Sequence, residues 1–115
     1  MYPRYRDRYL PALKAESIEA IPNKKTVPVI LPVGAIEQHG PHLPVGVDSL
    51  MAQARLDYAL PLLPESCRLW VAPAIAVGKS NEHTGFPGTL IVSKTVLRRQ
   101  IISIARQLGD LGFRI

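Results

Sequence analysis

The sequence has a single cysteine, Cys67, in 115 residues. One thiol cannot form a disulfide within the chain, so the fold does not depend on internal cross-links. Disulfide-rich secreted folds are therefore excluded, and the low cysteine content favours a reducing, cytoplasmic location. Cys67 has no evident general base nearby in sequence, and we interpret it as a buried bystander rather than a nucleophile.

Long apolar runs are also lacking. No uninterrupted apolar segment reaches the roughly 18–20 residues that a membrane-spanning helix needs. The N-terminus, MYPRYRDR, is charged and has no apolar segment behind it, so it does not resemble a secretory signal. There is no repeat of fixed period and no low-complexity tract. We therefore expect no membrane partner, and a chain of this size is at most one domain.

Acidic residues are outnumbered by basic ones, which gives a formal net charge of +5. Such an excess can indicate a nucleic-acid partner. However, the clustered arginines fall into two separate groups, at residues 4–8 and 98–106, and we expect neither group to have interleaved exposed aromatics or a nucleic-acid-binding motif. We interpret the two groups as a basic tail and a solvated helix face, and we expect no nucleic-acid binding.

Apolar residues make up 47% of the sequence and charged residues 20%, as in ordinary globular domains. Residues 1–14 are charged and broken by prolines, so we expect an N-terminal arm followed by one domain over residues 15–115. Apolar spacing, prolines and glycines predict helices over residues 15–21, 48–60 and 94–109 and strands over residues 26–33 and 67–73. Residues 112–115 have the character of a further strand.

Alternating strands and helices predict a largely parallel sheet with helices on both faces, that is, a three-layer α/β/α fold. A sheet that stops at the opening of a strand is expected to be incomplete at the C-terminus. The first strand contains two prolines, so we expect it to be irregular or to lie at an edge. Asp48 or Ser49 is expected to cap the second helix and Ser93 the third, because these side chains accept from free N–H groups.

Four metal-compatible side chains follow the first strand: Glu37, His39, His42 and Asp48. Glu37 and His39 are two positions apart, which places both on the same face of an extended segment. A carboxylate beside an imidazole suits Zn²⁺, Mn²⁺ or Fe²⁺, and the two oxygens of Asp48 can bridge two ions. His42 is a further candidate, as a ligand or as a support for one. The alternative is a loop ion pair between Glu37 and His39, with Asp48 acting only as a helix cap.

A second polar group lies in the loop at residues 74–92, which follows the second expected strand. Loops after successive parallel strands emerge at the same edge of a sheet, so this loop can face the first. We consider His83 a substrate-binding residue or proton shuttle, with Glu82 beside it, but a structural histidine bonded to the backbone fits equally well. Lys79 can meet an anionic group, although solvated lysines are the commoner case.

Two stretches resemble the creatininase (creatinine amidohydrolase) family. LPVGAIEQHGPHLP at residues 31–44 is similar to the family's signature, and GFPGT at residues 85–89, just after Glu82 and His83, resembles it as well. The resemblance spans roughly residues 15–115. It implies a three-layer α/β/α fold and a two-metal amidohydrolase, which is often a hexameric homo-oligomer. Related members act on small-molecule cyclic amides, formamides or modified peptides.

By this resemblance, Glu37 ligates one metal ion, His39 the other, and Asp48 bridges them, with a water between the ions as the nucleophile. The family completes its site with a further His and Glu after the strand that begins here near Gly112, and the sequence contains neither. The chain thus resembles the N-terminal half of such an enzyme. We consider two functions: a metal-dependent amidohydrolase that depends on further residues, and an inactive fragment that serves as an interaction module through its open sheet edge.

Overall fold

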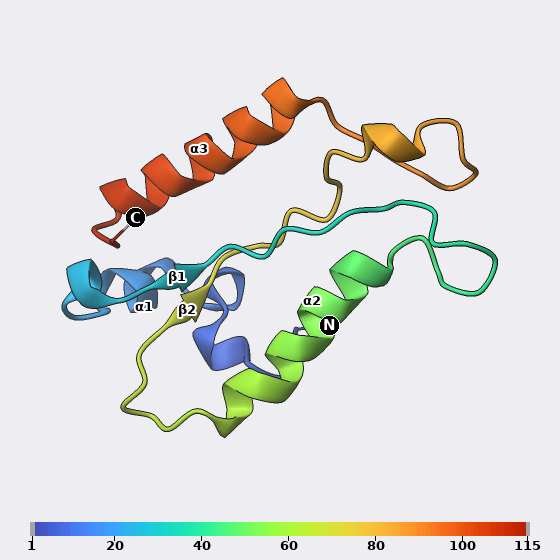
Figure 1. Ribbon diagram of the computed structural model, residues 1–115. Coiled ribbons are helices and arrows are strands. Elements are labelled where there is room, and N and C mark those ends of the chain that lie inside the picture. The colour runs from blue at the N-terminus through green and yellow to red at the C-terminus, as the bar shows by residue number, and fades with distance from the viewer. Residues whose placement is uncertain (1, 115) are drawn as a thin grey trace.

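The structure is a computed structural model, and it describes residues 2–114 (Figure 1). Its helices and strands, in chain order, are α1 (Ala15–Glu19), β1 (Val29–Ile30), α2 (Val47–Ala59), β2 (Trp70–Val71) and α3 (Lys94–Asp110). Short 3₁₀ helices lie between them: η1 (Arg6–Arg8), η2 (Leu10–Ala12), η3 (Lys24–Thr26), η4 (Leu60–Leu62) and η5 (Asn81–His83). Within residues 2–114, no helix has the length and apolar character needed to cross a bilayer.

Strands β1 and β2 form a parallel pair. The register places Val29 opposite Trp70 and Ile30 opposite Val71. Beyond the regular strands, a parallel bridge joins Val33 to Ile75, and the Gly34 N–H donates to the Ile75 carbonyl at 2.8 Å. The two segments therefore stay side by side past the end of the sheet, and they carry this contact into the loops that follow.

Proline limits the length of the regular strands. Of the strand expected over residues 26–33, only β1 is regular, and it lies between Pro28 and Pro32. Both prolines accept hydrogen bonds from the second segment, from the N–H groups of Trp70 and Ile75, but a proline cannot donate one in return. The expectation of an irregular first strand is confirmed, and the second strand is correspondingly short.

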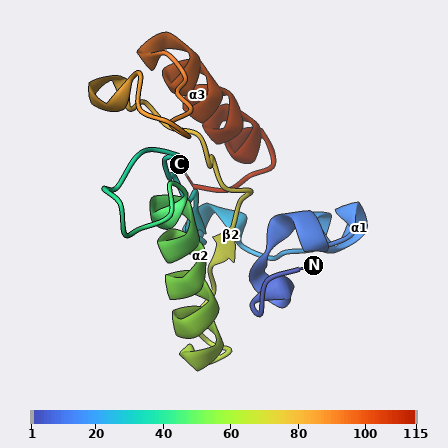
Figure 2. The ribbon, with the colours of Figure 1, turned by 90° about the vertical axis from the view of Figure 1, so that its right-hand side faces the viewer.

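Helices α2 and α3 lie on opposite sides of the paired segments, as the two views in Figures 1 and 2 show. The order of layers is thus helix, parallel strand pair, helix, and the expected α/β fold class is confirmed. The strand expected at residues 112–115 is not formed by residues 112–114, and residue 115 lies outside the described residues.

The start of α2 differs from the expectation. Gly46 occupies the N-cap position, without a side-chain cap, and Asp48 lies within the first turn. The helix begins early because the Val47 N–H bonds to the Pro44 carbonyl at 3.1 Å and closes a turn just ahead of it. The prediction that Asp48 or Ser49 caps this helix is therefore wrong, and the side chains of both residues are available for other contacts.

Helix α3 matches the expectation closely. The Ser93 hydroxyl accepts a hydrogen bond from the Val96 N–H at 3.2 Å, as an N-cap should. At the other end, Gly112 adopts a φ of 98°, and its N–H bonds to the Gly109 carbonyl at 2.8 Å. A left-handed glycine of this kind satisfies carbonyl groups that a helix end leaves free.

Two small apolar clusters form the core. One contains Leu10, Ile21, Val27 and Phe113, and the other contains Tyr5, Leu60 and Val71. Each cluster includes a residue from the expected N-terminal arm, so residues 2–14 pack against the rest of the chain. The Arg8 guanidinium holds this segment in place by donating to the carbonyl oxygens of Cys67 and Pro64. Cys67 itself is only partly buried.

Tyr5 links the N-terminal segment to α2. Burial raises the pKa of Tyr5 above its usual value of 10.0, and the Tyr5 hydroxyl donates a hydrogen bond to Gln53 Oε1 at 3.1 Å. A raised pKa means that the folded protein binds the phenolic proton more tightly than the unfolded chain does. The resulting stabilisation is complete below the unfolded-state pKa and is lost as the pH rises through the folded-state pKa.

We therefore expect the free energy of unfolding to fall as the pH rises above about 10. Urea unfolding followed at several alkaline pH values measures this slope. Tyr5→Phe should flatten the slope, because it removes the titrating group. Tyr58 is 72% exposed and provides a matched control, since Tyr58→Phe should leave the slope unchanged. An equally steep decline in Tyr5→Phe would contradict the prediction.

The paired segments approach each other closely at Gly34 and Gly78. A Cβ atom on Gly78 would lie 2.5 Å from the Gly34 carbonyl oxygen, and a Cβ on Gly34 would lie 2.9 Å from Ser49 Cα. Both contacts are with backbone atoms, which cannot move aside as a flexible side chain does. The two segments and the start of α2 can therefore meet only where these side chains are missing.

We expect Gly78→Ala to lower the free energy of unfolding by about 1–3 kcal/mol, the usual cost of overpacking. Gly46→Ala is the matched control, because its Cβ would meet nothing closer than 3.7 Å and its φ is an ordinary −92°. That control should cost under about 1 kcal/mol, as a change of N-cap residue does. Chemical denaturation of both variants makes the comparison, and equal effects would disprove the steric argument.

Candidate metal centre

Backbone hydrogen bonds fix the start of the first loop, residues 34–46, both to the end of the same loop and to the second loop. The Glu37 N–H donates to the Val45 carbonyl at 2.8 Å, and the Leu90 N–H donates to the Ile36 carbonyl at 2.9 Å. The second bond crosses from the loop that follows β2. The expectation that the two loops face each other is thus confirmed, because both continue from the same end of the parallel pair.

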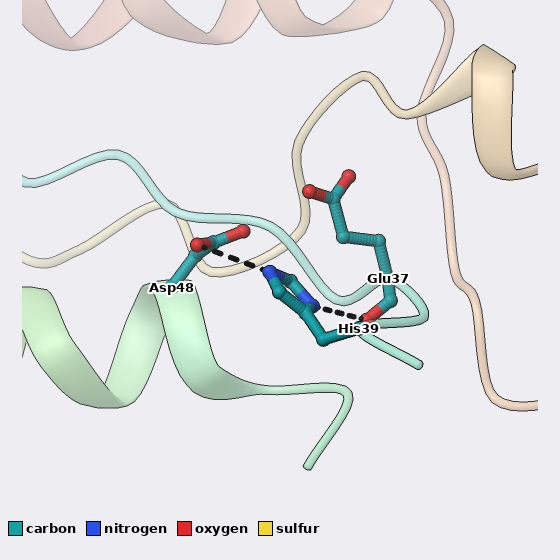
Figure 3. A group of neighbouring side chains, drawn as sticks. All are labelled: Glu37, His39 and Asp48. Atoms are coloured by element: carbon teal, nitrogen blue, oxygen red, sulfur yellow. Dashed lines mark hydrogen bonds and ion pairs between the residues drawn. The ribbon is translucent and has the colours of Figure 1, made fainter. Parts of the chain in front are cut away.

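His39 is fixed between Glu37 and Asp48, as Figure 3 shows. Its Nδ1 lies 2.9 Å from the Glu37 carbonyl oxygen, and its Nε2 lies 3.5 Å from Asp48 Oδ1. A carbonyl oxygen can only accept a hydrogen bond, so Nδ1 carries the proton and donates it. In the neutral ring this leaves the Nε2 lone pair directed at the Asp48 side, which is the usual arrangement of a metal-binding histidine.

The Glu37 carboxylate also contacts the second loop. Its Oε2 accepts a hydrogen bond from the Ser80 hydroxyl and lies 3.3 Å from His83 Nδ1. The side chain of Glu37 is 16% exposed and that of His83 28%, whereas Ser80 is almost completely buried. The second loop therefore supplies polar partners to the first loop's carboxylate.

Ser80 was missed by the sequence reasoning. A lone serine between a lysine and an asparagine has the appearance of an ordinary loop residue. The available signal was its position three residues before His83, because positions i and i+3 eclipse in a 3₁₀ helix and the two side chains therefore lie on one side. The structure places Ser80 at the N-cap of η5, which contains His83 at its last position.

The five sequence-predicted site residues gather in two groups that share Glu37. In the first group, ligand atoms of Glu37, His39 and Asp48 all lie within 4.8 Å of one another. In the second, ligand atoms of Glu37, Glu82 and His83 satisfy the same limit. His42 and Lys79 are exposed, and His42 belongs to no group of this kind among residues 2–114.

The first group fits a divalent metal ion in chemistry and in spacing. Two carboxylates and one imidazole are donors that Zn²⁺, Mn²⁺ and Fe²⁺ accept. The loop ion pair considered from the sequence, between Glu37 and His39, is not the arrangement found. His39 instead pairs with Asp48, and the Glu37 carboxylate pairs with His83. The helix-cap role of Asp48 is also not the one observed.

Comparison with known proteins gives one family. The creatinine amidohydrolase family model matches residues 11–115. The mycofactocin precursor peptide peptidase of Mycolicibacterium smegmatis is 38% identical over 89 residues, which cover 76% of this chain and 36% of that protein. The creatinine amidohydrolase of Pseudomonas putida is 34% identical over 91 residues, which cover 75% of this chain and 34% of that protein.

Solved structures agree. A crystal structure of creatinine amidohydrolase (creatininase) is 29% identical with a TM-score of 0.75, over 91% of this chain and 41% of that one. A creatininase structure named for manganese is 24% identical and shares the fold with a TM-score of 0.69, over 93% of this chain and 42% of that one. A mutant creatininase of the zinc–zinc type is also 24% identical, with a TM-score of 0.73 over 97% of this chain and 42% of that one. The chain spans about two fifths or less of the length of these proteins. Since the family model matches nearly all of it, the chain belongs to the creatininase family.

Proposed function

We propose that the chain provides the N-terminal part of the active site of a metal-dependent amidohydrolase of the creatininase type. Its reaction is hydrolysis of a C–N bond in a small cyclic or non-peptide amide. The observation that carries this proposal is the convergence of Glu37, His39 and Asp48, with ligand atoms within 4.8 Å, in a chain of this family.

Each of these residues has a defined task in the proposed site. Glu37 and Asp48 supply negatively charged oxygens, and His39 supplies the Nε2 lone pair that its hydrogen bond to the Glu37 carbonyl keeps free. In a complete enzyme we expect two ions, with Asp48 shared between them, and zinc, manganese or iron in the site. A bound ion of this kind lowers the pKa of water and polarises an amide carbonyl.

The substrate-binding side of the site lies at the second loop in this proposal. Glu82 and His83 border the metal group there, and Glu82 is exposed where it can meet a substrate. A cavity of about 570 Å³ also borders the metal group, lined in part by His39, Asp48 and Arg55, and it leaves room for a small molecule beside these two metal ligands.

The alternative function is an interaction module without catalytic activity. Helix α2 and the η4 turn expose large apolar side chains, with Leu50 62%, Tyr58 72% and Leu62 70% exposed. Within the described residues the sheet has two strands, so each strand has an edge to which a further strand can pair. Exposed apolar patches and open edges favour association, including homo-oligomer formation.

Metal binding tests the first function. We expect the chain to retain Zn²⁺ or Mn²⁺ after mild dialysis, measured by elemental analysis and by titration calorimetry. Glu37→Gln, His39→Asn and Asp48→Asn each remove a ligand and should weaken binding by more than about 100-fold, since even supporting residues contribute 10–100-fold. Glu65→Gln is the control, because this exposed carboxylate follows the opposite end of α2. Equal metal content in wild type and Glu37→Gln would falsify the site.

Light scattering tests the alternative. An interaction module should show a molar mass above the 12.7 kDa of one chain at micromolar concentration. The double variant Tyr58→Glu/Leu62→Glu should shift the mass toward one chain, because it places charges in the exposed apolar patch. A wild-type chain that is monodisperse at 12.7 kDa and melts cooperatively would count against this function.

A further inference from the structure

Within the described residues, only one of the two carboxylate oxygens of Glu37 accepts hydrogen bonds. Oε2 receives the Ser80 hydroxyl and faces His83 Nδ1 at 3.3 Å. The hydrogen bonds among residues 2–114 leave Oε1 without a partner. Two side chains of one loop are thus directed at the same oxygen atom, and one of them, Ser80, is 1% exposed.

We propose that Ser80 and His83 are positioning residues, which lock the Glu37 carboxylate through Oε2 and so reserve Oε1 for the metal ion. The proposal rests on the proposed function in one respect, because Glu37 must be a ligand for its orientation to affect binding. In this proposal His83 Nδ1 orients the Glu37 carboxylate, while the other ring nitrogen, Nε2, is free to contact a substrate.

The local backbone explains why both donors reach one atom. Ser80 is the N-cap of η5 and His83 its last residue, and the His83 N–H bonds to the Ser80 carbonyl at 3.0 Å. Residues three apart eclipse in a 3₁₀ turn, so their side chains project to the same side. The His83 ring also packs edge-on against Phe86, with ring centroids 6.4 Å apart and an interplanar angle of 71°, which limits its rotation.

A locked carboxylate binds a metal ion more tightly for a physical reason. A free glutamate side chain has several rotatable bonds, and fixing them on metal binding costs conformational entropy. Two hydrogen bonds to Oε2 restrict the Glu37 side chain already in the folded, metal-free protein, so most of this entropy is lost during folding and not on metal binding. They also set the direction of Oε1, as hydrogen bonds to ligating carboxylates commonly do.

Co²⁺ titration of the chain tests the proposal, because the visible absorption of Co²⁺ reports both affinity and ligand geometry. We expect Ser80→Ala and His83→Ala each to weaken binding by about 10–100-fold at unchanged stoichiometry. His83→Asn should recover most of the affinity, since its amide N–H can donate close to the Nδ1 position. His42→Ala is the control and should bind as the wild type does, because His42 is exposed and outside both groups.

A double-mutant cycle separates positioning from direct ligation. In a Glu37→Gln background, His83→Ala should change Co²⁺ affinity by no more than about 2-fold, because the two substitutions act on one contact. A full loss of affinity in that background would show His83 to be a ligand in its own right, and it would overturn the proposal. So would wild-type affinity in His83→Ala, an outcome that leaves the metal centre itself intact.

A second measurement requires no metal. The ¹⁵N chemical shift of His83 Nδ1 in the metal-free chain should change in Glu37→Gln, because the acceptor changes from a carboxylate to an amide. An unchanged shift would overturn the contact on which the proposal depends. If the wild-type chain bound no Co²⁺, the proposed metal-binding function would be wrong, but a changed Nδ1 shift in Glu37→Gln would still show the contact between His83 and Glu37. The failure of the proposed function can therefore be distinguished from the failure of the positioning proposal.

Discussion

The rest of the site depends on the close approach of two backbones at Gly34 and Gly78. No side chain fits between them, since a Cβ on Gly78 would lie 2.5 Å from the Gly34 carbonyl oxygen. The approach continues the parallel pairing of β1 and β2 into the loops, where Leu90 bonds to Ile36. This contact places Glu37 within reach of Ser80 and brings the second loop against the first.

The sequence predicted helices and one cap from local pattern, but it missed a local turn before α2 and the contact of one serine with a distant carboxylate. Helix α3 and its Ser93 cap follow from apolar spacing and from a hydroxyl before the first turn. The same reasoning chose Asp48 as a cap and was wrong, because a turn at Pro44 starts α2 earlier. Ser80 was missed because it contacts a carboxylate 43 positions away in sequence.

The spacing of Glu37 and His39 predicts two side chains on one face, and their ligand atoms lie within 4.8 Å of each other. Each side chain also has a further partner that the spacing could not predict, which is Asp48 for His39 and His83 for Glu37. A relative named for creatinine and one named for a precursor peptide both match about three quarters of this chain. The matched portion is thus shared by relatives whose names give different substrates.

The attachment of the N-terminal segment has a consequence for folding. Tyr9 forms a bridge with Val71, and Arg8 is held by the carbonyls of Cys67 and Pro64, so these two residues complete their contacts only with residues about sixty positions later. On the ribosome, Tyr5 must stay exposed until β2 has left the exit tunnel. Contacts of such long sequence separation slow folding, and they make the beginning of this chain one of the last parts to become ordered.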